Sequence, residues 1–397
     1  MIGAHKKATT LAAASFFAGA LALSPASAAD LGGNCCADLE ERVAELEATT
    51  VRKGNRKVSL KLSGQVNTAL LIWDDGDESD IYVVDTENSS TRFRLTGDAK
   101  IKPGWTAGFK IELDIDGHAN SADVDATNAD GTDGLSDDIL QLRHSDIYVK
   151  SPYGKLSLGQ GDSASNGTSE VDLSGTSVAG YAGIGDIGGS FEFVDSNGVG
   201  STILKGDTYS QLDGLSRNNR VRYDSPSLAG FIFSTSFGED NQYDFALRYK
   251  NKLGDFKVAG AIAYSEKEDD KGTDEDEERI NGSVSVFHIP TGLNFTFGAG
   301  DQDDGDDLEK TFYYGKVGIK RKWNSLGATA VSVDYGFGDE FDVAGGEFEH
   351  FGVQIVQKVD AAAMELYFAY SNDSYEDDFN TDLEDLNLFL IGSRIKF

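Results

Sequence analysis

From residue 58 to the end of the chain, apolar and polar residues alternate along most segments. Phe93 and Leu95, for example, alternate with Arg92 and Arg94. One apolar face and one polar face is the pattern of a half-buried β-strand. A soluble sandwich would turn the apolar faces inward, whereas a transmembrane barrel would turn them to lipid and line a water-filled interior with the polar faces. The pattern therefore predicts an all-β protein and leaves two architectures open.

The lengths of the connections distinguish these architectures. We predict sixteen strands, which begin near residues 58, 91, 105, 140, 155, 217, 230, 243, 254, 279, 292, 311, 326, 347, 362 and 385. Every second connection is short, and the intervening ones are mostly long and polar; the connection near 239–242 is a short exception. Tight turns on one side and long loops on the other are typical of transmembrane barrels. We therefore predict a 16-stranded antiparallel transmembrane β-barrel over residues 58–397.

The N-terminus has the pattern of a signal peptide over residues 1–28. Lys6 and Lys7 precede the apolar segment Ala8–Leu23, and Ala26-Ser27-Ala28 is an A-x-A cleavage site. The mature chain is therefore exported. After this segment, no apolar run reaches the ~18 residues that a transmembrane helix needs.

Residues 29–57 form the one segment with a helical pattern. Leu39, Val43 and Leu46 have heptad-like spacing, but barely two heptads are not stable alone. We predict a short periplasmic helical or coiled-coil segment, or a solvated spacer.

Composition argues against nucleic-acid binding, a disordered chain and a disulfide-stabilised fold. The formal net charge of -32 would repel the phosphates of nucleic acid. High charge can also indicate disorder, but aromatic residues make up 10% of the chain and lie in regular strand patterns. The two cysteines cannot form a disulfide framework.

Several motifs resemble the trimeric general-diffusion porins of Gram-negative outer membranes. The segments are Arg143–Gln160, a strand-turn-strand, and Arg220–Pro226 followed by Gly230-Phe231. The Cys-Cys-Ala-Asp-Leu-Glu-Glu-Arg-Val segment resembles the alphaproteobacterial branch of this family. The resemblance implies a homotrimer in the outer membrane, in contact with lipid and lipopolysaccharide, that lets small hydrophilic solutes and ions diffuse passively without a cofactor.

The end of the chain resembles the terminal signal that the barrel-assembly machinery reads in outer-membrane barrels. The last residue is aromatic, and the final strand alternates apolar and basic residues. Its apolar face carries Phe389, Ile391, Ile395 and Phe397.

The longest connection, residues 161–216, lies where the resemblance places an inward-folded constriction loop. It contains Asp162, Glu170, Asp172 and Asp186, and it is rich in glycine, which allows tight folding. A mobile surface loop is the alternative interpretation.

Basic residues are expected on the wall that faces this loop, where opposed charges would create a transverse field. Strand parity places Lys61, Arg92, Arg94, Lys110, Arg220 and Arg222 on the polar face. Arg143 is a further candidate, but the alternation of its strand breaks near Asp146.

Other predicted external loops are dense in carboxylates. Their oxygens can bind Ca²⁺ or Mg²⁺, and the candidate ligands of a weak cation site are Asp301, Asp303, Asp304, Asp306 and Asp307. These residues lack the spacing of an EF-hand, and we favour a solvated loop. A negative outer mouth would concentrate cations, so we expect weak cation selectivity.

Three other functions are alternatives to a general pore. An enzyme is disfavoured, because His144 and Ser145 are neighbours in a strand and point to opposite faces, and no Gly-x-Ser-x-Gly motif occurs. A solute-specific channel and an envelope-tethering or adhesive barrel remain as alternatives.

Overall fold

The computed structural model describes residues 57–115, 119–129, 140–239, 241–267, 277–303, 308–380 and 382–397. The predicted signal peptide (1–28) and, except for Lys57, the predicted helical segment (29–57) lie outside these residues. No helix within the described ranges is long and apolar enough to cross a membrane.

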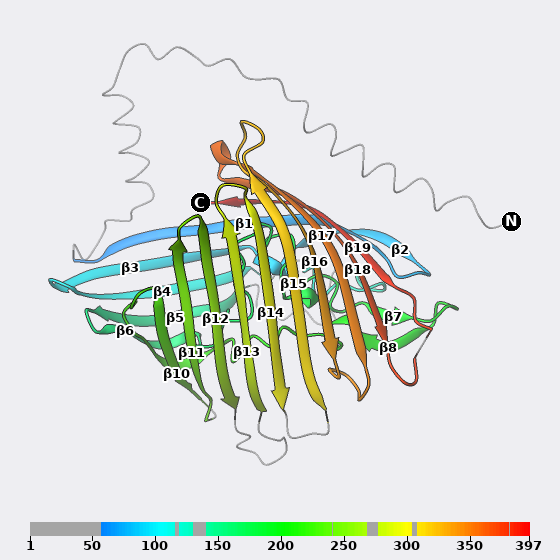
Figure 1. Ribbon diagram of the computed structural model, residues 1–397, viewed down its shortest axis with the longest axis horizontal. Helices are drawn as coiled ribbons and strands as arrows, with labels where there is room; N and C mark the ends of the chain where they lie inside the picture. Colours follow the sequence, from blue (N-terminus) through cyan, green and yellow to red (C-terminus); the bar gives the residue numbers. More distant parts are fainter. Residues whose placement is uncertain are drawn as a thin grey trace, which may run out of the picture. The chain divides into compact units, whose positions relative to one another are not determined.

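Sixteen strands of the described chain form one closed antiparallel sheet (Figure 1). Strand β1 (Ser59–Asp74) pairs with β3 (Arg92–Lys102) and also with the last strand, β19 (Leu386–Lys396), which closes the barrel. The remaining strands are β4 (Trp105–Ile115), β5 (Leu140–Ser151), β6 (Gly154–Asp162), β9 (Arg217–Asp224), β10 (Phe231–Gly238), β11 (Tyr243–Leu253), β12 (Phe256–Lys267), β13 (Glu277–His288), β14 (Leu293–Asp303), β15 (Glu309–Arg321), β16 (Thr329–Asp339), β17 (Glu347–Val359) and β18 (Met364–Glu376). The predicted 16-stranded barrel is confirmed, and each predicted strand start lies within three residues of the observed one.

The first long connection is not a simple loop, as the sequence pattern had suggested for residues 74–90. It contains a short strand, β2 (Ser79–Asp85), which pairs with β1 over Thr68–Asp74. The alternation continues through it, because Tyr82 and Val84 are buried whereas Val83 is exposed. The 3-10 turn η1 (Glu87–Ser89) then interrupts the sheet before β3 begins.

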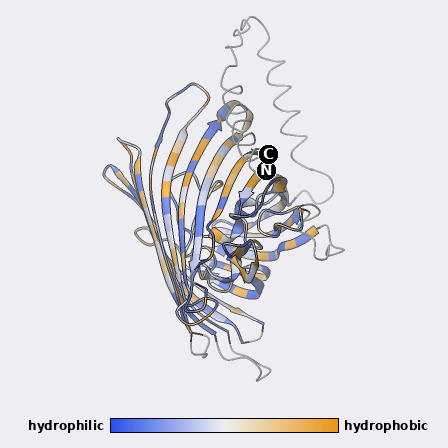
Figure 2. Cartoon of the chain, turned by 90° about the vertical axis from the view of Figure 1, so that its right-hand side faces the viewer, coloured by the Kyte–Doolittle hydropathy of each residue, from blue (hydrophilic) through white to orange (hydrophobic). Residues whose placement is uncertain are grey.

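The two faces of the barrel follow the predicted parity. Along β10, Phe231 and Phe233 are exposed, whereas Ser234, which follows Phe233, is buried on the inner side. Figure 2 shows the same alternation of hydrophobic and hydrophilic positions along many strands. Apolar outward faces allow the barrel to span a lipid bilayer.

The connection between β6 and β9, residues 163–216, packs against the inner face of the barrel, and we call it the inner loop. It contains two short paired strands, β7 (Glu192–Val194) and β8 (Gly200–Leu204), and the 3-10 turns η2 (Ile184–Asp186) and η3 (Lys205–Asp207). Its backbone N–H groups at Val171 and Leu173 donate to the inward hydroxyls of Ser283 and Ser285 on β13. Small polar residues on the wall therefore serve as attachment points for the loop.

Part of the inner wall is apolar, which corrects the expectation that inward faces only line water. Phe191 of the inner loop packs on Trp73 of β1, with ring centroids 5.1 Å apart. Phe193 stacks on Tyr375 of β18 at 5.9 Å. Inward-facing Leu388 of β19 is also buried in this cluster. The inner loop thus shares a hydrophobic core with β1 and β19, a packing that strand alternation alone does not reveal.

Two buried lysines also fasten the inner loop to the wall. Lys205 Nζ lies 2.8 Å from Asp373 Oδ2 of β18. Lys316 of β15 lies 3.1 Å from Asp172 of the loop and donates to the carbonyl oxygen of Gly180 at 2.6 Å. Because each lysine is paired with a carboxylate, burial does not leave an uncompensated charge.

Candidate channel constriction

A polar cavity of about 540 Å³ lies between the inner loop and the barrel wall. Arginines of five wall strands and carboxylates of the loop line it together. The charged lining residues in the described chain are Glu87, Arg92, Arg143, Glu170, Asp186, Asp213, Arg217, Arg279 and Arg394. This arrangement places positive charge on the wall and negative charge mainly on the loop.

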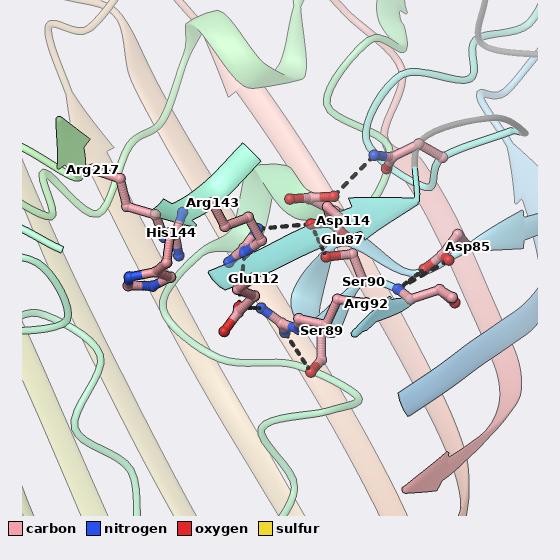
Figure 3. Close-up of polar contacts among 12 residues, drawn as sticks. Asp85, Glu87, Ser89, Ser90, Arg92, Glu112, Asp114, Arg143, His144 and Arg217 are labelled. Atoms are coloured by element: carbon pink, nitrogen blue, oxygen red, sulfur yellow. Dashed lines mark hydrogen bonds and ion pairs between the residues drawn. The ribbon is translucent and has the colours of Figure 1, made fainter. Parts of the chain in front are cut away.

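Basic side chains on β3, β4 and β5 gather around one buried carboxylate, that of Glu112. Figure 3 shows Glu112 with two of them, Arg92 and Arg143. Glu112 lies 2.5 Å from Arg94 Nε and 3.3 Å from both Lys110 Nζ and Arg143 Nε. Arg92 contacts it at 3.6 Å. Because these four cations share Glu112, this part of the wall carries excess positive charge.

A β-bulge explains why the alternation breaks in β5. The pairing with β4 shifts between Glu112 and Leu113, which lie opposite His144 and Leu142. The extra residue, Arg143, therefore points to the inner side together with His144, and its Nη1 lies 2.8 Å from Asp114. The bulge directs a guanidinium group into the cavity at a position that parity left open.

The turn η1 brings a second backbone segment to the cavity. Asn67 of β1 donates from Nδ2 to the carbonyl oxygen of Ser89 at 2.9 Å. The backbone N–H of Thr91 lies 3.1 Å from the Asp85 carboxylate. These bonds hold Glu87 and Ser89 at the cavity. The alternation of residues does not predict this feature, although Asn-Ser-Ser-Thr is typical turn chemistry.

The carboxylates of the loop and turn have raised pKa values. Burial, helped by repulsion from Asp186, raises the pKa of Glu87 to about 7. Burial raises that of Asp186 to about 6, although the Tyr181 hydroxyl donates a hydrogen bond to it. Burial and the charge of Asp213 also raise the pKa of Glu170. At neutral pH, the acidic side of the cavity is therefore only partly ionised.

Four of the eleven residues predicted for the constriction line this cavity: Arg92, Arg143, Glu170 and Asp186. Arg94 and Lys110 contact Glu112 and do not line the cavity. Lys61 is exposed on β1, opposite Thr96, and does not line the cavity.

The other four predicted residues are engaged elsewhere. Asp172 holds Lys316, and Asp162 contacts His144 and Arg217 at 3.3 and 3.2 Å. Arg220 is paired with Asp146 at 2.8 Å, and Arg222 with Asp224 at 2.7 Å. None of these four side chains lines the cavity.

Five further residues of this site were not predicted from the sequence: Glu87, Asp213, Arg217, Arg279 and Arg394. Alternation places Arg279 and Arg394 on inward faces, beside Ile280 and Ile395, which point outward. Alternation gives the face of a residue but not its height along the barrel. The set of residues that line the cavity therefore depends on the position of the inner loop, which alternation does not predict.

The proposed cation site is only partly within the described chain. Asp301 and Asp303 lie in strand β14, not in a loop as predicted, and flank buried Gln302. Asp304, Asp306 and Asp307 lie outside the described residues. No group of carboxylates, histidines or cysteines suited to a metal ion is found among the residues that are described, and the site stays a prediction.

The end of the chain closes the barrel. Phe397 donates its backbone N–H to the carbonyl of Gly64 at 3.0 Å, and Gly64 donates back to Phe397 at 2.9 Å. Ile395 and Phe397 are exposed, and Phe389 and Ile391 share their outward parity. The Phe397 ring covers Gly64, where a Cβ atom would lie 2.6 Å from it.

A family model described as Gram-negative porin matches residues 8–378. The chain belongs to this porin family. Among solved structures, this porin is similar to the anion-selective porin of Comamonas acidovorans, with 16% identity and a TM-score of 0.59 over 86% of this chain and 100% of the other. It is also similar to a loop-deletion mutant of OmpT, an outer membrane protein of Vibrio cholerae, with 15% identity and a TM-score of 0.58 over 86% and 100%. Salmonella typhi OmpF in complex with daunomycin matches at 13% identity and a TM-score of 0.52 over 87% and 99%.

A comparison with characterised protein sequences finds no match. Family membership and the barrel nevertheless identify the chain as an outer-membrane protein that forms a diffusion channel.

Proposed function

We propose that this porin is a general-diffusion channel whose narrow zone is the 540 Å³ cavity beside the inner loop. The observation that carries the proposal is the opposition of wall arginines and loop carboxylates across a polar space. Polar solutes can align in a transverse field, whereas apolar solutes must displace ordered water. Small hydrophilic solutes and ions would therefore pass preferentially.

Ion selectivity is proposed to be weak. The chain as a whole is strongly acidic, and its outer loops would attract cations. The cavity itself holds arginines opposite carboxylates that are only partly ionised, and this excess of positive charge would attract anions. These two effects oppose each other, and outer charges are screened within ~8 Å at physiological salt.

Single-channel recording in planar bilayers tests the channel. Ser210→Trp should lower conductance, because Ser210 lines the cavity and an indole would occupy part of it. Leu228→Trp is the matched control, since Leu228 lies in a turn and is 80% exposed. Liposome swelling with sugars of increasing size should show a smooth decline in uptake.

Each alternative predicts a different result. Uptake that saturates for one sugar would indicate a solute-specific channel. Folded protein without conductance steps would indicate a tethering or adhesive barrel, and would refute the channel proposal.

We also propose a homotrimer. A solved trimer form of the Vibrio cholerae OmpT protein supports this, with 15% identity and a TM-score of 0.55 over 86% of this chain and 99% of that one. Lipopolysaccharide and the barrel-assembly machinery are proposed partners, the latter on account of the terminal Phe397. We propose no enzymatic activity and no required cofactor, with acidic loops as weak Ca²⁺ or Mg²⁺ ligands at most.

A further inference from the structure

Two guanidinium groups meet at a single uncharged oxygen beside the cavity. Arg394 of β19 donates from Nη1 to the hydroxyl oxygen of Ser89 at 2.5 Å, and Arg92 of β3 donates from Nη2 to the same oxygen at 3.0 Å. The three residues all line the cavity. Guanidinium hydrogen bonds to anionic oxygens are roughly twice as strong as those between neutral groups. The two like charges therefore share an acceptor that does not neutralise them.

The carboxylates near these arginines are already shared. Arg394 contacts Glu365 at 2.5 Å, but Lys358 and Lys396 contact the same carboxylate at 3.3 and 3.2 Å. Arg92 reaches Glu112 only at 3.6 Å. Glu112 is held more closely by Arg94, Lys110 and Arg143. Neither local carboxylate therefore offsets the charge of the pair in full.

The backbone at Ser89 is fixed before any ligand arrives. Gln65 Nε2 lies 2.8 Å from the carbonyl oxygens of both Ser89 and Ser90, and also 2.8 Å from the hydroxyl oxygen of Ser89. Asn67 donates to the Ser89 carbonyl, and the hydroxyl of Ser90 donates to Asp114 at 2.6 Å. Ser89 is thus held in place by β1 and η1, and its hydroxyl positions the two guanidinium groups, so binding would require little ordering of the protein.

We propose that Arg92 and Arg394 form an oxyanion-binding subsite in the channel, which takes the carboxylate or phosphate group of a small solute. The anionic oxygens would replace the Ser89 hydroxyl as acceptor, and each planar guanidinium group suits such a group geometrically. The inference rests on the proposed diffusion channel and adds a transient binding step to it.

Single-channel current through the full protein, with inorganic phosphate or acetate added to KCl, tests the subsite. Wild type should show a saturable, concentration-dependent reduction of current. Arg92→Gln and Arg394→Gln should each weaken the apparent affinity about tenfold, the effect of losing a charge-assisted hydrogen bond. Ser89→Ala should strengthen binding, because it frees both guanidinium groups from their internal acceptor.

Arg279→Gln is the matched control. It removes one arginine from the same cavity, but on β13, which is eight strands from β3 around the barrel. Its affinity for the probe should stay close to that of wild type. If Arg394→Gln fails to fold because Glu365 loses its partner, Arg92→Gln still tests the subsite.

Two results would overturn the proposal. One is a current that does not saturate with either probe, and the other is an equal loss of affinity in Arg92→Gln and Arg279→Gln, which would indicate a diffuse field. In both cases the channel would still conduct, so the proposed function would stand. A response to one probe alone supports the subsite and identifies the group that it prefers.

Discussion

At the scale of single residues, the ionisation of a few carboxylates controls the charge of the cavity. Burial raises the pKa of Glu87 to about 7 and that of Asp186 to about 6, and it also raises the pKa of Glu170 and Asp213. Groups with raised pKa values are neutral below them, so acidification removes negative charge from this side of the cavity. The arginines keep their charge throughout this range.

The ratio of K⁺ to Cl⁻ permeability should therefore fall as pH decreases from 9 to 5. Reversal potentials in a KCl gradient measure this ratio. Glu170→Gln should lower the ratio at pH 9 and make it less sensitive to pH, because it removes one titrating carboxylate. Asp195→Asn is the control, since this exposed residue has a lowered pKa and stays ionised across the range. A ratio that does not change with pH would show that these carboxylates do not control permeation.

At the scale of elements, the position of the inner loop depends on buried attachments to the wall. Lys316 of β15 binds Asp172 and the Gly180 carbonyl, and Lys205 of the loop binds Asp373. Removing one partner of a buried ion pair costs about 3–5 kcal/mol, because the other charge is left unpaired. The loop is thus fixed by a few contacts of high energy.

Lys316→Met should loosen the loop, with more open-channel noise and faster proteolysis within residues 163–216. Lys322→Met is the matched control. Lys322 and its partner Asp360 are 3.8 Å apart and largely exposed, and such a pair contributes only ~0–1 kcal/mol. Equal behaviour of the two variants would show that the hydrophobic contacts, and not Lys316, position the loop.

At the scale of the whole molecule, closure of the barrel depends on its two ends. β1 and β19 pair over Gln65–Asp74, and Phe397 extends this pairing through its two backbone bonds to Gly64. The Phe397 side chain is 62% exposed on the outer side. The residue thus contributes both backbone bonds to the seam and an aromatic ring to the outer surface.

Two variants, a deletion of Phe397 and Phe397→Ala, should separate these roles. Both changes should reduce the amount of folded barrel in the membrane if the ring is the assembly signal. Phe397→Ala should refold normally in detergent, because the backbone bonds to Gly64 remain, whereas the deletion should refold less completely. Gel mobility with and without boiling measures the folded fraction. Normal yield in cells for Phe397→Ala would refute a role of the ring in assembly.

The sequence by itself determined the sixteen strands of the barrel and the face of most of their residues, because a period of two and turn chemistry are local properties. The broken alternation in β5 was visible as well, but only its pairing with β4 shows the bulge that turns Arg143 inward. Tertiary structure alone decided which charged residues meet. Lys61 and Arg92 share a polar face yet only Arg92 reaches the cavity, because depth along the barrel depends on strand pairing and on the inner loop. The inward packing of Trp73 and Leu388 was likewise decided by a loop distant in sequence, which a local pattern cannot encode.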